Sequence, residues 1–320
     1  MDRKLLLEYV RVCEAAAIAC SRLMGHGDKH AADQRAVTAM RRAFDRVPAR
    51  GVIVIGEGEM DEAPMLYIGE HVGPDDPSLP EVDIAVDPLE GTNLIAKGMP
   101  GALTVMAVAE RGKLLHAPDV YMEKIAAGPE GVGVVSLDKS PTENLLALAD
   151  AKGKRVHDMN VVLLDRPRHE SIIGELRRAG ARVSLITDGD VNPTVAVGLP
   201  DTGIDMYMGV GGAPEGVLSA AALKCLRGEF QGRLKFADDD ERNRAIGMGL
   251  SDPDAILRLD DIVRGDCLFA ATGVTRGPLL AGAKVYGDQV RLNSIGLRSD
   301  TNTVRFFETW TNTDHLPVDE

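Results

Sequence analysis

Apolar residues near the start of the chain recur at the spacing of a helix. One stripe consists of Leu6, Tyr9, Cys13, Ala16, Cys20 and Leu23. It predicts an amphipathic helix over residues 3–24 that ends at Gly25. We expect this helix to pack in the core and between subunits.

A second helix is predicted from the apolar stripe of Val37, Met40 and Phe44. Extended towards the N-terminus, this stripe reaches Asp33 and then Lys29. A carboxylate on the inward edge of a helix needs a partner, so Asp33 is a candidate metal ligand. An ion pair with Lys29 within the helix is the alternative.

Two apolar runs of strand length lead directly into acidic residues. Residues 52–55 are the first run, and Gly56 and Glu57 follow it. Glycines let the backbone approach an ion, and Glu57 is the first side chain able to reach it. We therefore assign Glu57 to a metal, with Asp61 in a supporting position. The alternative is a helix N-terminus, whose dipole favours acids in the first turn.

The second run, residues 82–86, leads into Asp87-Pro88-Leu89-Glu90-Gly91-Thr92-Asn93. Pro88 cannot continue a strand ladder and Gly91 can take unusual backbone angles, which predicts a sharp turn that aims Asp87 and Glu90 at one point. Two close carboxylates repel each other unless cations neutralise them, and such ligands suit Mg²⁺ or Mn²⁺. A helix starting after Asn93 would add an anion site. An acidic turn that closes a strand is the alternative.

The middle of the chain predicts a hairpin and then alternating strands and helices. Residues 104–110 and 113–120 predict the two strands of the hairpin. Tyr121 follows them, where its ring and hydroxyl can cover a sugar; packing on the hairpin is the alternative. A helix is predicted over residues 141–151, and from residue 161 onwards short apolar strands alternate with helices, as in an α/β layer.

Three polar turns of this layer are candidates for binding a sugar phosphate. In the first, Arg166 and Arg168 flank Pro167, before a helix predicted over residues 170–179. The helix dipole favours acids rather than bases at that position. An anion between the arginines removes this conflict, because guanidinium groups bind phosphate through paired hydrogen bonds. Exposed basic residues on a turn are the alternative.

The second turn, Asp188-Gly189-Asp190, follows a strand predicted over residues 182–186, at the strand end where open α/β sheets place ligands. Its acids can accept hydrogen bonds from sugar hydroxyls. The third is the glycine-rich run 209–216, which follows a strand over residues 204–208. Pro214 replaces the third glycine of a dinucleotide loop there, so NAD is rejected. Glycine amides at a helix start fit a sugar phosphate, with Glu215 as a further ligand or as a favourable first-turn acid.

Composition and net charge limit the classes of protein to which this chain can belong. The chain has 320 residues, of which 44% are hydrophobic, and we expect two subdomains, 1–155 and 156–320. The net charge of −13 argues against a nucleic-acid partner. We find no apolar run long enough to span a membrane, no signal peptide and no closely spaced cysteine pair, so a cytoplasmic location is expected. Strands predicted over residues 267–272, 284–286, 290–298 and 302–309 suggest an antiparallel closing sheet.

Together these segments resemble class II fructose-1,6-bisphosphatase, the bacterial-type branch of the lithium-sensitive, metal-dependent phosphatase superfamily. The resemblance covers nearly the whole chain. It rests on residues 27–29, 56–59, 87–93, 121–124, 166–169, 188–190 and 209–216. The superfamily motif at residues 87–93 alone does not distinguish a sugar bisphosphate from an inositol phosphate.

The resemblance implies an α/β (α+β) fold, a layered α-β-α-β-α sandwich, in a homo-oligomer, either a dimer or a tetramer. It also implies Mn²⁺ or Mg²⁺, with more than one ion per site, bound by Asp33, Glu57, Asp87, Glu90 and Glu215. The implied substrate contacts are Glu90, Gly91, Thr92, Tyr121, Arg166, Pro167, Arg168, Asp188, Gly189, Asp190 and Gly212. Catalysis falls to Asp87, Glu90 and Thr92.

The implied activity is metal-dependent hydrolysis of the 1-phosphate of fructose 1,6-bisphosphate to fructose 6-phosphate, a step of gluconeogenesis and glycerol metabolism. Arg166 and Arg168 would grip the distal phosphate, and Thr92 would orient the attacking water. Two alternatives stand beside it: an enzyme that also accepts sedoheptulose 1,7-bisphosphate, and a non-catalytic sugar-phosphate sensor. The full set of mutually repelling acids argues against the sensor.

Overall fold

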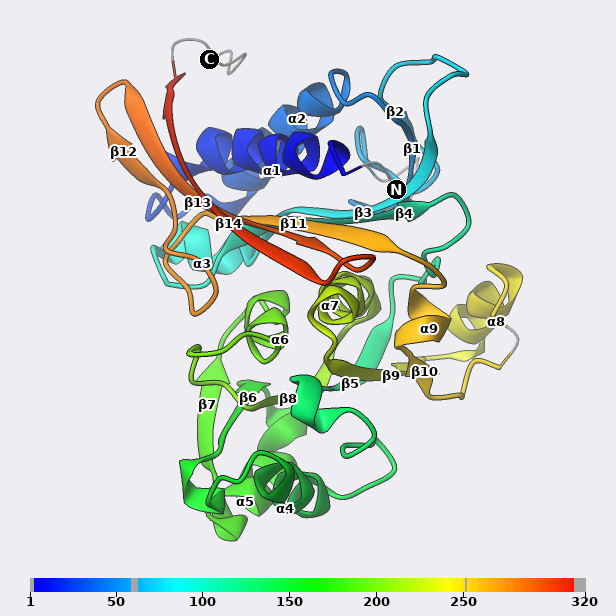
Figure 1. Ribbon diagram of the computed structural model, residues 1–320, viewed down its shortest axis with the longest axis vertical. Helices are drawn as coiled ribbons and strands as arrows, with labels where there is room; N and C mark the ends of the chain where they lie inside the picture. The colour runs from blue at the N-terminus through cyan, green and yellow to red at the C-terminus, as the bar shows by residue number, and fades with distance from the viewer. Residues whose placement is uncertain (1–2, 59–62, 251, 314–320) are drawn as a thin grey trace. The chain divides into compact units, whose positions relative to one another are not determined.

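The computed structural model describes residues 3–58, 63–250 and 252–313, and the chain divides into two compact units (Figure 1). Unit 1 comprises Met1–Leu114 and Gly265–Glu320, and unit 2 comprises Leu115–Arg264. These bounds differ from the expected 1–155 and 156–320. Unit 1 is discontinuous because strands near the C-terminus pair with a strand that comes far earlier in the chain. Asp61, expected beside the metal ligands, lies outside the described residues.

Unit 1 contains a mixed sheet of eight strands among the described residues. Their order is β12 (Lys284–Tyr286), β13 (Gln289–Arg298), β11 (Cys267–Gly273), β4 (Leu103–Glu110), β3 (Glu81–Glu90), β1 (Arg50–Ile55) and β2 (His71–Val72), and β14 (Thr303–Asn312) pairs with β13. β1 and β3 run parallel, whereas the other neighbours are antiparallel. The four predicted C-terminal strands are present, and they belong to the same sheet as β3 and β4.

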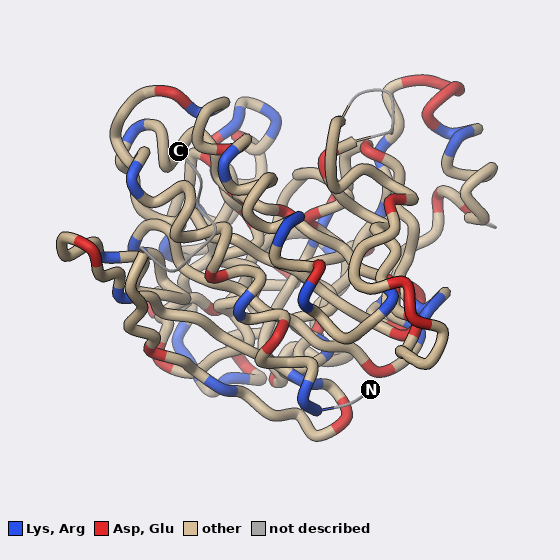
Figure 2. The backbone as a smooth tube through the Cα atoms, turned by 90° about the horizontal axis from the view of Figure 1, so that it is seen from above, with Lys and Arg blue, Asp and Glu red and all other residues tan. Residues whose placement is uncertain are grey.

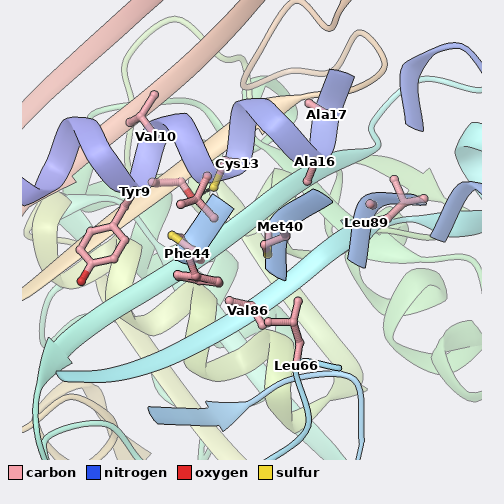
Figure 3. Close-up of a cluster of buried hydrophobic side chains, with 14 of the residues drawn as sticks. Tyr9, Val10, Cys13, Ala16, Ala17, Met40, Phe44, Leu66, Val86 and Leu89 are labelled. Carbon is pink, nitrogen blue, oxygen red and sulfur yellow. Dashed lines mark hydrogen bonds between the residues drawn. The ribbon is translucent and has the colours of Figure 1, made fainter. Parts of the chain in front are cut away.

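Two helices, α1 (Leu5–Ser21) and α2 (Lys29–Phe44), pack on this sheet, as their apolar stripes predict. Figure 3 shows Cys13 of α1 and Met40 and Phe44 of α2 in one buried cluster with Val86 of β3. The small residues of α1 allow the helix to lie close to its neighbours. Cys13 and Cys20, which lie on the apolar stripe of α1, are free and buried.

Two local predictions for unit 1 are wrong. The strand expected to stop before Pro88 continues as β3 to Glu90, and its pairing with β4 shifts register between Asp87 and Glu90. Pro88 has no N–H to donate, so the ladder is interrupted around it without ending. The hairpin expected over residues 104–120 has only its first strand, β4. Residues 113–120 do not continue beside it, because β3 and β11 occupy both edges of β4.

Unit 2 contains a mixed sheet of six strands among the described residues. Their order is β10 (Leu257–Arg258), β9 (Glu229–Lys235), β5 (Tyr121–Ala127), β8 (Met206–Gly212), β6 (Asn160–Leu164) and β7 (Arg182–Ile186). β6 runs parallel to both β7 and β8. The apolar pattern does not predict β5 or β9, because polar residues such as Lys124 and Gln231 interrupt it.

Helices pack on both faces of the unit 2 sheet. α4 (Pro141–Ala151) and α5 (Glu170–Ala179) cover one face, and both have their predicted bounds. α7 (Ala213–Leu226) lies on the other face, where Gly216 allows Met122 of β5 to approach closely. α6 (Val191–Ala196) packs beside α7, and α8 (Asp239–Gly247) and α9 (Leu259–Ile262) complete the unit.

The predicted α/β fold class is confirmed, because each unit joins a mixed sheet to packed helices. Along the backbone, basic positions are interspersed with acidic ones (Figure 2). In the described parts of the chain, no helix combines the length and the apolar character needed to cross a bilayer.

Candidate functional site

Four acids of unit 1, Asp33, Glu57, Asp87 and Glu90, form what we call the acidic group. Asp33 lies on α2, Glu57 follows β1, and Asp87 and Glu90 belong to β3. β1 and β3 are parallel neighbours, with Ile55 opposite Ala85. Glu57 and Asp87 therefore come two residues beyond a paired position, at the same edge of the sheet. The pairing of β1 with β3 therefore places Glu57 and Asp87 on neighbouring segments of the sheet.

The acids of this group act on one another. Burial and, after it, the nearby charges of Asp87 and Asp33 together raise the pKa of Glu57 to about 8. Burial also raises the pKa of Asp33, whereas His30 lowers it. Carboxylate oxygens of Asp87 and Glu90 lie within 4.8 Å of each other, and Glu90 is buried. Like charges held this close favour a bound cation, so the donor set fits a divalent metal ion.

The segment after Asp87 shapes the edge of the acidic group. The Asp87 side chain accepts a hydrogen bond from Leu89 N at 3.0 Å. Gly91 has φ 88°, and a Cβ there would lie 2.9 Å from the Leu94 side chain, so a glycine is required. α3 (Thr92–Lys97) begins directly after it, earlier than the expected start beyond Asn93. Glu90, Gly91 and Thr92 thus form the junction between β3 and α3.

In unit 2, the structure brings Tyr121, Arg168 and Gly212 together. Tyr121 is the first residue of β5 and pairs with Gly212 of β8. The Arg168 guanidinium lies 5.0 Å from the centre of the Tyr121 ring, and its Nη2 and Nε donate to Val210 O at 2.7 and 3.2 Å. A guanidinium carries five N–H donors, so Arg168 keeps donors for an anion.

Arg166 lies in the same segment but has different contacts. Its guanidinium donates to Asp165 O and Thr187 O, both at 2.9 Å. It therefore ties this segment to the end of β7, next to Asp188 and to Gly189, which has φ 74°. Pro167 begins the short 3₁₀ helix Pro167–His169 between Arg166 and α5.

His169 has no role assigned from the sequence, and in the structure it connects two segments of unit 2. Its Nδ1 lies 2.7 Å from Leu164 O, and Val210 N donates to its Nε2 at 2.8 Å. Burial is the largest cause that lowers the pKa of His169, which favours the neutral ring that this pair of bonds requires. His169 thereby fixes the arginine segment against β8.

Asp190 is buried within unit 2, in what we call the Lys124 network. Its carboxylate forms an ion pair with Lys124 at 2.7 Å and accepts a hydrogen bond from Tyr207 at 2.7 Å. Gly211 allows this close packing, because a Cβ there would lie 2.3 Å from Asp190 Oδ2. Sequence reasoning missed Lys124 and Tyr207; a lysine inside a strand, between Met122 and Ile125, is the signal that could have found them.

Glu215 lies in the first turn of α7, as predicted. Burial raises its pKa, Lys124 lowers it and Asp190 raises it again, with a raised pKa as the net result. Its Oε2 is buried without a hydrogen-bond partner among the described residues. A Cβ at Gly212 would lie 2.0 Å from that oxygen. A buried carboxylate oxygen without a donor fits a cation ligand, and its use together with the acids of unit 1 stays a prediction.

Comparison with known proteins adds independent information. The family model described as bacterial fructose-1,6-bisphosphatase, glpX-encoded, matches residues 3–311. A relative from Synechococcus sp. (strain JA-3-3Ab) is 48% identical over 332 aligned positions, covering 97% of this chain and 96% of the relative. A second, from Synechocystis sp. (strain ATCC 27184 / PCC 6803 / Kazusa), is 46% identical over 334 positions, with the same coverage. Both are named D-fructose 1,6-bisphosphatase class 2/sedoheptulose 1,7-bisphosphatase.

The match includes both units and every candidate site residue. The family and the enzyme class predicted from the sequence, a sugar bisphosphatase of the phosphoric monoester hydrolases, are confirmed. The acidic group fits the metal dependence expected of such an enzyme. The chain therefore belongs to the family of bacterial, glpX-encoded fructose-1,6-bisphosphatases.

Proposed function

We propose that this chain hydrolyses the 1-phosphate of fructose 1,6-bisphosphate, and that Mn²⁺ or Mg²⁺ is required. The observation that supports this most strongly is the acidic group, where burial and two neighbouring acids raise the pKa of Glu57 to about 8. Such a group of carboxylates can function in an enzyme when bound cations neutralise their negative charges. The family match supplies the sugar bisphosphate as the substrate class.

The proposed metal ligands are Asp33, Glu57, Asp87, Glu90 and Glu215. When bound, divalent ions lower the pKa of water and stabilise charge on the phosphoryl oxygens. The chain itself supplies these carboxylates from α2, from the segment after β1, from β3 and from the first turn of α7. Thr92, adjoining Glu90 through Gly91, orients the attacking water with its hydroxyl. Backbone amides at the start of α3 face the phosphoryl group.

The distal 6-phosphate is proposed to bind Arg166 and Arg168. The guanidinium of each is anchored to backbone carbonyls and keeps further N–H donors for phosphate. Tyr121, in contact with Arg168, covers the sugar. Binding energy from this end positions the reacting end.

The other proposed substrate contacts come from two backbone turns of unit 2. Asp188 accepts hydrogen bonds from sugar hydroxyls through its carboxylate, and Gly189 donates a hydrogen bond to them through its backbone N–H. Asp190 acts through the Lys124 network, which holds the turn in position. Gly212 and Pro167 allow the substrate to approach the backbone closely.

A second activity is supported by the relatives, whose names include sedoheptulose 1,7-bisphosphatase. The reacting end of that sugar carries the same 1-phosphate, so the acidic group would serve both substrates. We also propose a cytoplasmic location and a homo-oligomer. The four cysteines are free and buried, which suits a reducing compartment.

Phosphate release measured with fructose 1,6-bisphosphate, sedoheptulose 1,7-bisphosphate and inositol 1-phosphate, each with Mn²⁺, Mg²⁺ or a chelator, tests the proposal. We expect turnover of the first substrate, and none in chelator. Asp87→Asn should lower kcat at least ~10³-fold without loss of fold. Asp150→Asn, on the exposed side of α4, is the matched control. Full activity of Asp87→Asn with saturating metal would refute the assignment.

A further inference from the structure

A second cluster of charge, of the opposite sign, occupies unit 1. The start of α1 and the ends of β13 and β14 line a hollow of about 640 Å³. This size falls within the range of small-molecule pockets. Among its lining residues Glu8 is the one acid, and Leu6, Leu7 and Phe307 are apolar. Its basic residues are Arg3, Lys4, Arg11, Arg298 and Arg305. Such a basic hollow is unexpected in a chain with a net charge of −13.

The register of the sheet explains how the hollow is built. Gly296 of β13 lies opposite Arg305 of β14. A Cβ at Gly296 would lie 3.1 Å from the Leu6 side chain, so the glycine lets the first turn of α1 pack directly on β13. Arg298, two residues beyond Gly296, points to the same face of the sheet. The fold therefore places both arginines beside the start of α1.

The basic residues of the hollow are only partly neutralised. Arg11 pairs with Glu8 at 2.7 Å, and Arg298 pairs with Asp300 through Nε at 3.0 Å and through a second bond from Nη2. Arg298 is buried, at 8% exposure, so this pair fixes its guanidinium. No carboxylate of the described residues forms an ion pair with Arg305. Its charge adds to that of Arg3 in a confined space, which an anion would stabilise.

The start of α1 also favours a bound anion. Lys4 occupies the N-cap of α1 and its side chain does not cap the helix. Basic residues at a helix start are unfavourable for the helix dipole, whereas an anion is favourable there. Guanidinium groups match a phosphoryl group through paired hydrogen bonds. We propose that this hollow, which we call the basic hollow, binds a small phosphate-bearing anion at a site separate from the acidic group.

The ligand is either free inorganic phosphate or the phosphoryl group of an ester, and calorimetric titration distinguishes these sources. The full-length protein is titrated in chelator with inorganic phosphate in one arm and with fructose 6-phosphate in the other. The background variant is Arg168→Ala, so that the proposed substrate site contributes little. We expect Arg305→Gln to weaken binding about tenfold, as the loss of a charged hydrogen bond implies. If only the first arm responds, the ligand is free phosphate; if both respond, a phosphoryl group suffices.

Arg35→Gln is the matched control, because Arg35 is exposed on α2 and does not line the hollow. A second readout is amide hydrogen exchange at residues 5–8, which we expect the ligand to slow in the parent protein but not in Arg305→Gln. The proposal is overturned if Arg305→Gln binds as tightly as its parent in both arms, or if Arg35→Gln weakens binding equally. Failure of the phosphatase assay would leave this result unaffected, since no turnover is measured.

Discussion

The acidic group of unit 1 and the Lys124 network of unit 2 both bury carboxylates, but they stabilise them differently. In the network, Asp190 lies against a cation, Lys124, and a hydroxyl, Tyr207. In the acidic group, the charges that act on Glu57 are those of further acids, Asp87 and Asp33. The network is a completed structural pair, whereas the acidic group is stabilised when a ligand of opposite charge is bound.

This difference separates the proposed metal ligands from residues that hold the fold. A buried acid that is paired with an internal cation contributes to the stability of the fold. Breaking that ion pair removes this stability. A buried acid among other acids opposes folding and gains from neutralisation. Removing one charge from each cluster should therefore have opposite effects on stability.

The largest expected effect comes from Glu57→Gln. With saturating Mn²⁺ we expect kcat to fall about 10³-fold, because an oxygen ligand of the proposed metal site is lost. In chelator the same variant should melt at a higher temperature than the parent, because repulsion with Asp87 and Asp33 is relieved. Initial rates and thermal melts measure both, with Glu110→Gln as an exposed control. If Glu57→Gln melted at a lower temperature than the parent in chelator, the proposed repulsion within the acidic group would be contradicted.

Asp190→Asn should have the next largest effect, on stability. Lys124 would stay buried without its counter-charge, and we expect a loss of about 3 kcal/mol in the free energy of unfolding. Urea denaturation of the metal-free protein measures it, and Asp165→Asn, which changes an exposed acid, serves as the control. A loss below about 1 kcal/mol would show that the ion pair does not hold the network together.

Arg168→Ala tests the substrate end of unit 2. Loss of a guanidinium that binds the distal phosphate should raise KM about tenfold, and kcat should change less. Steady-state kinetics with fructose 1,6-bisphosphate give both constants. Arg177→Ala, on α5, is the control of equal charge. An unchanged KM would remove Arg168 from the substrate site.

The smallest effect concerns pH. Burial raises the pKa of Asp205, but bonds from Lys154, Asn160 N and Lys152 outweigh it, so the pKa is lowered overall. The stability from this acid is present above the pKa of the unfolded state, about 3.9, and is lost as pH falls through the lower folded value. Asp205→Asn should cost about 1 kcal/mol at pH 7 and progressively less in acid. An equal cost at pH 7 and at pH 3 would contradict this assignment.

Local sequence patterns predicted much of this structure. The stripes of α1 and α2 and the bounds of α4, α5 and β7 follow from residue spacing, because an amphipathic element shows which face it buries. The strands that lead to Glu57 and Asp87 were identified in the same way, although β3 continues beyond Asp87 to Glu90. The prediction of a hairpin after β4 was wrong, because the pairing of β4 with β11 depends on residues far away in the chain.

The sequence by itself determined which residues are candidates for the chemistry: the acids that follow apolar strands, the arginine pair and the glycine-rich turn. Spacing and residue type are local, so they can be read without the fold. Only the tertiary structure decided which charged side chains lie next to one another. It set Glu57 beside Asp33 and Asp87, gave Asp190 to Lys124, and gathered Arg298 and Arg305 at the start of α1. Charge interactions depend on distance in space, and a linear pattern does not contain that distance.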